Sequence, residues 1–192
     1  HAGPKEPIRP TQTAPDGHPK PAALCLSPSG DELFVACEGN GRVVALKTAD
    51  LSVRGQLDLA GRPAGIAIDR GGRLLAIPCS LPDRLLLVDA ASLALIASVA
   101  VGAGPVGVAI DENSQFAWVA NSESNDLSIV DLAARREVRR LTAGRRPWGV
   151  AIDPQSQRVL VTSLLADVAL ADEVPSCEVT VVDAQRQRVE AR

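Results

Sequence analysis

One unit of about forty residues occurs four times along this chain, and this repeat constrains the fold more than any other feature. Its first element begins at Pro21, Pro63, Pro105 and Pro147, an interval of 42 residues each time. A second element follows in constant phase and reads LFVAC, LLAIPC, FAWVAN and VLVTS. A third reads RVVALK, RLLLVD, DLSIVD and EVTVVD. Three elements in one order in every unit indicate a true structural repeat.

Each element has the character of a β-strand. Segments such as VGVAID and LSIVDL are rich in β-branched residues and alternate with a period of two. Turn-forming residues separate the elements, and a fourth stretch ends in Gly before the next Pro. Each unit is therefore predicted to be a four-stranded antiparallel meander. An all-β protein with this period and strand number is typical of a β-propeller, in which each unit is one blade.

The repeat also predicts the domain organisation. We expect blades at 21–62, 63–104, 105–146 and 147–192, preceded by an extended Pro-rich leader or linker at 1–20. The fourth unit carries an inserted loop at 164–177, and its last strand is incomplete, without the exit through Gly to Pro that ends the other units. We therefore expect the four blades to belong to a larger propeller of about seven blades. The chain would then be the N-terminal part of a longer protein.

Composition excludes several classes of function. The chain has 46% hydrophobic residues and a net charge of −3, but no apolar run long enough to span a membrane. Its slight acidity argues against nucleic-acid binding. The only histidines, His1 and His18, lie in the leader, so a histidine-dependent catalytic triad is not expected within the repeats. There is no CxxC or CxxCH motif, and we predict no metal, cofactor or catalytic residue in this chain.

Two of the four cysteines occupy one repeat position. Cys37 and Cys79 both end the second element, in neighbouring units. They could form a disulfide between the two blades, or they could be small buried thiols at strand ends. The sequence leaves both alternatives open.

The third unit resembles a known repeat family. Its block P-x-G-V-A-I-D, followed by W-V-A-N and N-D-L-S-I-V-D-L, is similar to the YVTN-type β-propeller repeat, and the resemblance extends over residues 21–192. Cys37 and Cys79 depart from the pattern, since the third unit has Asn121 there. The resemblance implies a periplasmic or extracellular protein. Related repeats occur in surface-layer proteins and in lactonase-like and quinoprotein-like propellers. They also occur beside c-type cytochrome or di-haem peroxidase-type domains, so any haem would lie in a downstream domain.

Propeller geometry places the fourth-to-first and second-to-third connections of all blades on one face, and we expect ligands there. Arg145, Arg146 and Trp148 are the most distinctive group on this face, because two guanidinium groups beside an indole can bind a carboxylate, a phosphate or an acidic loop. They could instead be solvated charges with a tryptophan that caps the blade. The inserted loop should rise over the same face. The predicted ligand- or partner-binding residues are Arg62, Asn121, Arg145, Arg146, Trp148, Asp167 and Asp172, and Glu123 and Asn125 accompany them.

Aspartates recur at two positions of the unit. Asp69, Asp111 and Asp153 end the first element, and Asp89, Asp131 and Asp183 end the third. An aspartate before a tight turn accepts hydrogen bonds from the backbone amides of that turn, so we predict a structural role for all of them.

Two functions are compatible with these features. The first is an exported binding or scaffold module that presents its loop face to a protein partner, an adjacent domain or a small anionic ligand. The alternative is the propeller portion of an enzyme, either lactonase-like or quinoprotein-like, or attached to a c-type cytochrome or di-haem peroxidase-type domain. The chain by itself is not expected to be catalytic.

Overall fold

The computed structural model describes residues 18–165 and 178–192. Every regular element in these ranges is a β-strand. The first sheet contains β1 (Pro21–Leu26), β2 (Glu32–Cys37), β3 (Arg42–Lys47) and β4 (Val53–Asp58). The second contains β5 (Arg62–Pro63), β6 (Ala67–Ile68), β7 (Leu74–Ser80), β8 (Arg84–Asp89) and β9 (Leu95–Ala100). The third contains β10 (Pro105–Ile110), β11 (Phe116–Asn121), β12 (Asp126–Asp131) and β13 (Arg136–Thr142). The fourth contains β14 (Arg145–Asp153), β15 (Arg158–Leu165), β16 (Glu178–Asp183) and β17 (Arg188–Ala191).

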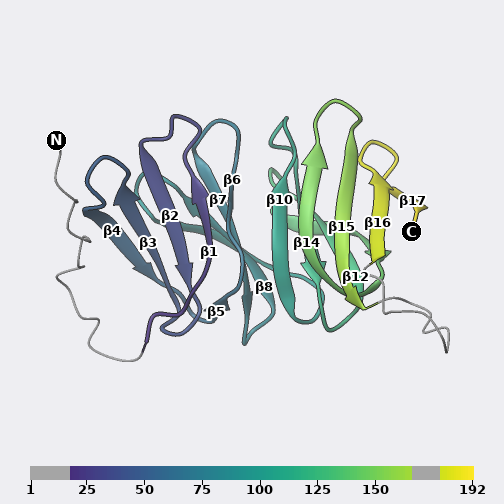
Figure 1. The fold of residues 1–192 in the computed structure, drawn as a ribbon, viewed down its shortest axis with the longest axis horizontal. Coiled ribbons are helices and arrows are strands. Elements are labelled where there is room, and N and C mark those ends of the chain that lie inside the picture. The colour runs from purple at the N-terminus through teal and green to yellow at the C-terminus, as the bar shows by residue number, and fades with distance from the viewer. Residues whose placement is uncertain (1–17, 166–177) are drawn as a thin grey trace, which may run out of the picture.

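Each sheet is an antiparallel meander whose strands pair in sequence order, as the repeat predicts. In the second sheet the first strand is split into β5 and β6, which both pair with β7. We call the four sheets blades 1 to 4. Figure 1 shows them as a fan, in which the sheets of blades 1 and 4 extend in opposite directions from the middle. The strands β1 and β14 lie near the middle, and β4 and β17 lie toward the two ends.

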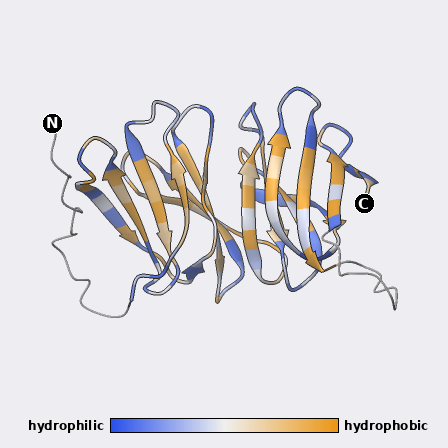
Figure 2. Ribbon diagram, viewed as in Figure 1, coloured by the Kyte–Doolittle hydropathy of each residue, from blue (hydrophilic) through white to orange (hydrophobic). Residues whose placement is uncertain are grey.

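The hydrophobic core consists of three layers, one between each pair of neighbouring blades. Because side chains alternate along a strand, each interior blade contributes to two layers. In β11, Ala117 and Val119 pack toward blade 2, whereas Trp118 and Ala120 pack toward blade 4. The strands β7 and β11 are consequently buried along almost their whole length. Figure 2 shows the apolar residues concentrated along the strands of each blade.

The innermost strands of blades 2, 3 and 4 approach one another so closely that glycine is required between them. A Cβ atom on Gly65 would collide with the carbonyl oxygen of Val106, and one on Gly107 would collide with that of Trp148. Both glycines occupy the same repeat position, where blade 1 has Ala23, so the inner strands of blades 2 and 3 each lie directly against the backbone of the next. The small residues of the first element are therefore explained by this contact.

The recurring aspartates have the structural role predicted for them. The Asp69 carboxylate accepts hydrogen bonds from the amides of Arg73 and Leu74, at 2.6 and 2.7 Å. Asp111 makes the equivalent bonds to the following turn. The second set behaves in the same way, since Asp131 accepts a 2.8 Å bond from the amide of Ala134. Each carboxylate closes the turn that connects two strands of its blade.

Candidate functional site

The loop face is formed by the ends of the strands where each blade is joined to the next. At the junction of blades 3 and 4, Asn125 lies in the turn between β11 and β12 with a φ angle of 58°. Its side-chain oxygen accepts a 2.8 Å bond from the amide of Arg146, and its carbonyl accepts a 3.0 Å bond from the amide of Ala143. Asn125 therefore fixes the chain as it crosses into blade 4.

Arg145, Arg146 and Trp148 lie together at the start of β14, the innermost strand of blade 4. Both arginines are exposed, and 51% of Trp148 is accessible to solvent. The register of β14 shifts between Pro147 and Val150, so Trp148 lies within a bulge. No ion pair joins either arginine to another residue within 18–165 and 178–192. Exposed guanidinium groups of this kind can bind an anion that approaches the loop face.

Arg62 is not part of this cluster. It lies at the junction of blades 1 and 2, where its Nη2 donates to Glu38 Oε1 at 2.6 Å. Arg62 and Arg146 occupy the same repeat position, immediately before the first Pro of a blade, but they belong to different junctions. Lys20 occupies this position in blade 1, and it is exposed. A comparison of the residues that precede each Pro would have identified Lys20 from the sequence.

Asn121 does not lie on the exposed part of this face, contrary to the role predicted for it. Its side chain is fully buried and donates to Asp126 Oδ1 at 2.7 Å and to Ser128 Oγ at 2.8 Å. The amide of Gly102 also donates to Ser128 Oγ, at 3.2 Å. Asn121 thus belongs to an internal polar network that joins blade 3 to the exit of blade 2, and it has no access to a ligand.

The remaining predicted residues fall into two groups. Asp167 and Asp172 lie outside the described residues, as does most of the inserted loop predicted at 164–177, of which β15 includes the first two positions. Cys37 and Cys79 are both buried free thiols, so the disulfide considered between blades 1 and 2 is not formed. Burial raises the pKa of the Cys79 thiol to about 12, which makes it a poor nucleophile at neutral pH.

Within the described ranges, no group of three or more His, Cys, Asp or Glu side chains could hold a metal ion. The same part of the chain contains no helix long and apolar enough to cross a membrane.

Comparison with known proteins supports the architecture. No protein-family model matches the chain, and no curated protein matches it either. Among solved structures, the chain is similar to hydrazine synthase of Kuenenia stuttgartiensis, with a TM-score of 0.82 and 22% sequence identity. The match covers 95% of this chain and 51% of the hydrazine synthase chain, so this chain spans about half the length of its neighbour. The likeness shows that this chain has a β-propeller-like fold.

Proposed function

We propose that this chain is a binding and scaffold module of YVTN type, exported from the cell, that forms one arc of a larger propeller. In this proposal further blades or an adjacent domain cover the free sides of blades 1 and 4, and the loop face binds an acidic partner or a small anionic ligand. The observation that carries the proposal is that both terminal sheets expose an apolar face. The interior blades support the proposal by contrast, because a neighbouring blade covers each of their two faces.

The exposed faces follow from the alternation of the strands. In blade 1, Phe34 and Val43 are buried against blade 2, whereas Val35 and Val44 on the other side are only partly buried, and Leu24 is 64% exposed. Cross-strand pairing places Leu24, Val35 and Val44 on one face. In an interior blade, the equivalent face is buried by a neighbouring sheet.

Blade 4 shows the same asymmetry. Val159 and Val161 are fully buried against blade 3, but Leu160, Leu164 and Val179 are 36%, 54% and 41% exposed. Figure 1 shows the sheets of blades 1 and 4 extending toward opposite ends of the long axis, so neither covers the free face of the other. A further sheet on each side would bury these residues as the interior residues are buried.

Gly149 supports the same proposal at the innermost strand. It occupies the repeat position of Gly65 and Gly107, which accept the backbone of the next blade. A Cβ on Gly149 would meet only the Thr162 hydroxyl, at 2.9 Å, and no carbonyl of another blade within the described residues. The space that the other two glycines provide is thus retained on the free side of blade 4.

The scaffold role is tested by hydroxyl-radical footprinting of the isolated chain and of the product of the complete reading frame. Leu160 and Leu164 should be labelled in the isolated chain and protected at least severalfold in the longer product. Leu81, which is 73% exposed on a loop, should be labelled equally in both and serves as the control. Equal labelling of Leu160 and Leu164 in the two samples would refute the proposal that another sheet covers blade 4.

The binding role of the loop face is tested with a short polyglutamate peptide. Because Trp118 is fully buried, a change in tryptophan fluorescence on titration should come from Trp148. Substituting both Arg145 and Arg146 with Ala should weaken binding at least about tenfold, as expected when two charge-assisted contacts are lost. The control is the double alanine variant of Arg135 and Arg136, an exposed arginine pair at the opposite end of blade 3. Equal affinities for the wild type and both variants would contradict the proposal.

A second candidate is the propeller portion of an enzyme, and the likeness to a protein named hydrazine synthase favours it. A CxxCH motif downstream in the complete reading frame, together with haem bound by its product, would support this candidate. A reading frame that contains only further units of the repeat would favour the binding module.

A further inference from the structure

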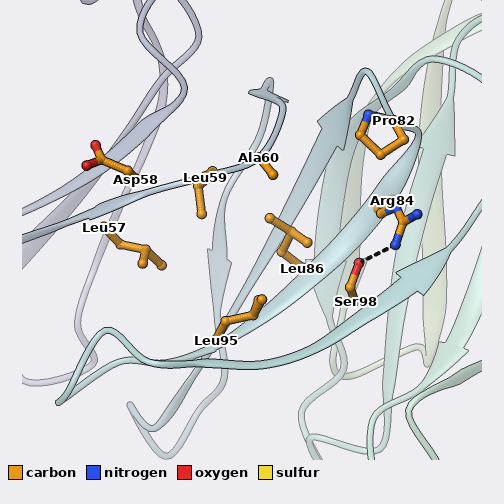
Figure 3. A pocket seen from close by; sticks show the side chains of 9 residues that line it. All are labelled: Leu57, Asp58, Leu59, Ala60, Pro82, Arg84, Leu86, Leu95 and Ser98. Carbon is orange, nitrogen blue, oxygen red and sulfur yellow. Dashed lines mark hydrogen bonds between the residues drawn. The ribbon is translucent and has the colours of Figure 1, made fainter.

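A groove lies at the junction of blades 1 and 2, away from the arginine–tryptophan cluster and independent of the function proposed above. It has a volume of about 390 Å³. Figure 3 shows Leu57 and Leu59, from β4 and the segment after it, facing Leu86 and Leu95 of β8 and β9 across this space. Pro82 and Arg84 lie at one end. This volume falls within the range of small-molecule sites.

One central position of the groove has an apolar residue in blade 2, as blade 1 does with Val44, whereas the last two blades have a hydroxyl side chain there. The residue equivalent to Leu86 is Ser128 in blade 3 and Thr180 in blade 4. The Ser128 hydroxyl accepts a 3.2 Å bond from the amide of Gly102, and the Thr180 hydroxyl accepts a 3.2 Å bond from the amide of Gly144. A leucine side chain cannot make this bond, so the lining of the first junction is apolar where the other two are polar.

The space beside the position of Leu86 is filled at the junction of blades 2 and 3 and left open at the junction of blades 1 and 2. A Cβ on Gly102 would come within 2.5 Å of Asn121 Nδ2 and of Asp126 Oδ1, because these side chains occupy the space. At the first junction the residue equivalent to Gly102 is Ala60, whose methyl group lines the groove. The residue equivalent to Asn121 is Cys79, which packs into the core between the blades and leaves the groove unfilled.

The charge at the groove is positive. The Arg84 guanidinium donates one bond to Ser98 Oγ at 3.2 Å, and no carboxylate among residues 18–165 and 178–192 forms an ion pair with it. The other charged residue at the groove, Asp58, is paired with Arg42 at 2.6 Å. Arg84 therefore has donors left for an anion beside an apolar surface.

We propose that this groove binds a small apolar carboxylate, such as a medium-chain fatty acid. The hydrocarbon part of the ligand lies on Leu57, Leu86 and Leu95, and its carboxylate accepts hydrogen bonds from the Arg84 guanidinium. The ligand thereby buries leucine side chains, of which Leu95 is 55% exposed, and pairs a guanidinium group that has no carboxylate partner in the described part of the chain.

The proposal is tested with octanoate as the probe and the 192-residue chain with methyl-labelled leucines, followed by NMR. Octanoate should shift the methyl resonances of Leu57, Leu86 and Leu95. Arg84→Gln should weaken octanoate binding at least about tenfold, because it removes a charge-assisted contact. The same variant should bind octanol as the wild type does, since octanol has no charge. Arg62→Gln removes a guanidinium outside the groove and should leave the affinity for octanoate unchanged.

A second variant tests the apolar surface. Leu86→Ser introduces the residue found at the equivalent position of blade 3, and it should abolish octanoate binding. A thermal melt shows whether Leu86→Ser is folded. If it is not folded, Arg84→Gln still tests the proposal, because it alters an exposed side chain. Octanoate shifts outside the groove, or an affinity unchanged in Arg84→Gln, would overturn the proposal. Neither result would affect the polyglutamate experiment, so the two proposals can fail separately.

Discussion

Replacing Gly107 with Ala should lower the free energy of unfolding, because it pushes the inner strands of blades 3 and 4 apart. The new methyl group would collide with the carbonyl oxygen of Trp148, which is a backbone atom and cannot rotate away as a side chain could. Overpacking of this kind typically costs about 1–3 kcal/mol, and contact with backbone belongs at the upper end of that range. The backbone angle of Gly107 is not left-handed, so the collision alone should set the sign.

The matched comparison is Gly149→Ala at the equivalent position of blade 4. There the methyl group meets only the Thr162 hydroxyl. Alanine also restricts the unfolded chain, which favours folding by about 0.4–1 kcal/mol, so we expect a net change in the free energy of unfolding below about 1 kcal/mol. Urea denaturation measures both variants, and for a chain of this size each kcal/mol should also lower Tm by about 2–4 °C. Equal stability of Gly107→Ala and Gly149→Ala would refute the close contact between inner strands.

Four further outcomes follow from hydrogen bonds and burial. Asp69→Ala should lower the free energy of unfolding by about 2–3 kcal/mol in urea denaturation, because two backbone amides lose a charged acceptor. Ser128→Ala leaves two buried N–H groups without this acceptor and should cost about 1–3 kcal/mol in the same assay. The Ser156 hydroxyl lowers the pKa of Asp153, and the Arg186 amide lowers that of Asp183. Both carboxylates therefore stabilise the fold above their unfolded pKa of about 3.9. The midpoint of urea denaturation should fall as the pH is lowered from about 5 through the folded pKa values. A midpoint that stays constant down to about pH 3 would contradict this. The buried Cys79 thiol should react with a thiol reagent at pH 8 only after unfolding, and rapid labelling of the native chain would show that it is accessible.

The fold could be predicted from the sequence because every feature that determines it repeats. The interval between Pro21 and Pro63 is the length of one whole blade, and the aspartates before the turns mark where strands end. The repeat predicts a strand at FAWVAN, and the structure shows the two sides of this strand packed against different blades. Four copies make such a pattern visible even though no single copy would be decisive.

The site was less predictable because it depends on contacts between blades. The repeat correctly places Asn121 at the end of β11, but the polar network that holds its buried side chain also includes the amide of Gly102, which belongs to blade 2. The ion pair of Arg62 with Glu38 likewise joins residues of two different units. The groove was missed for the same reason, since Leu86 is an unremarkable strand residue until it is compared with Ser128 in three dimensions.

The close approach of the inner strands also bears on how such a protein can evolve. Each junction is made by the same positions of adjoining units, so a duplication or deletion of one whole unit would join surfaces that already fit. An insertion or deletion of one residue within an inner strand would shift Gly107 away from the carbonyl that it accommodates and would exchange the two sides of that strand. The contacts between inner strands are therefore preserved when the number of blades changes by whole units.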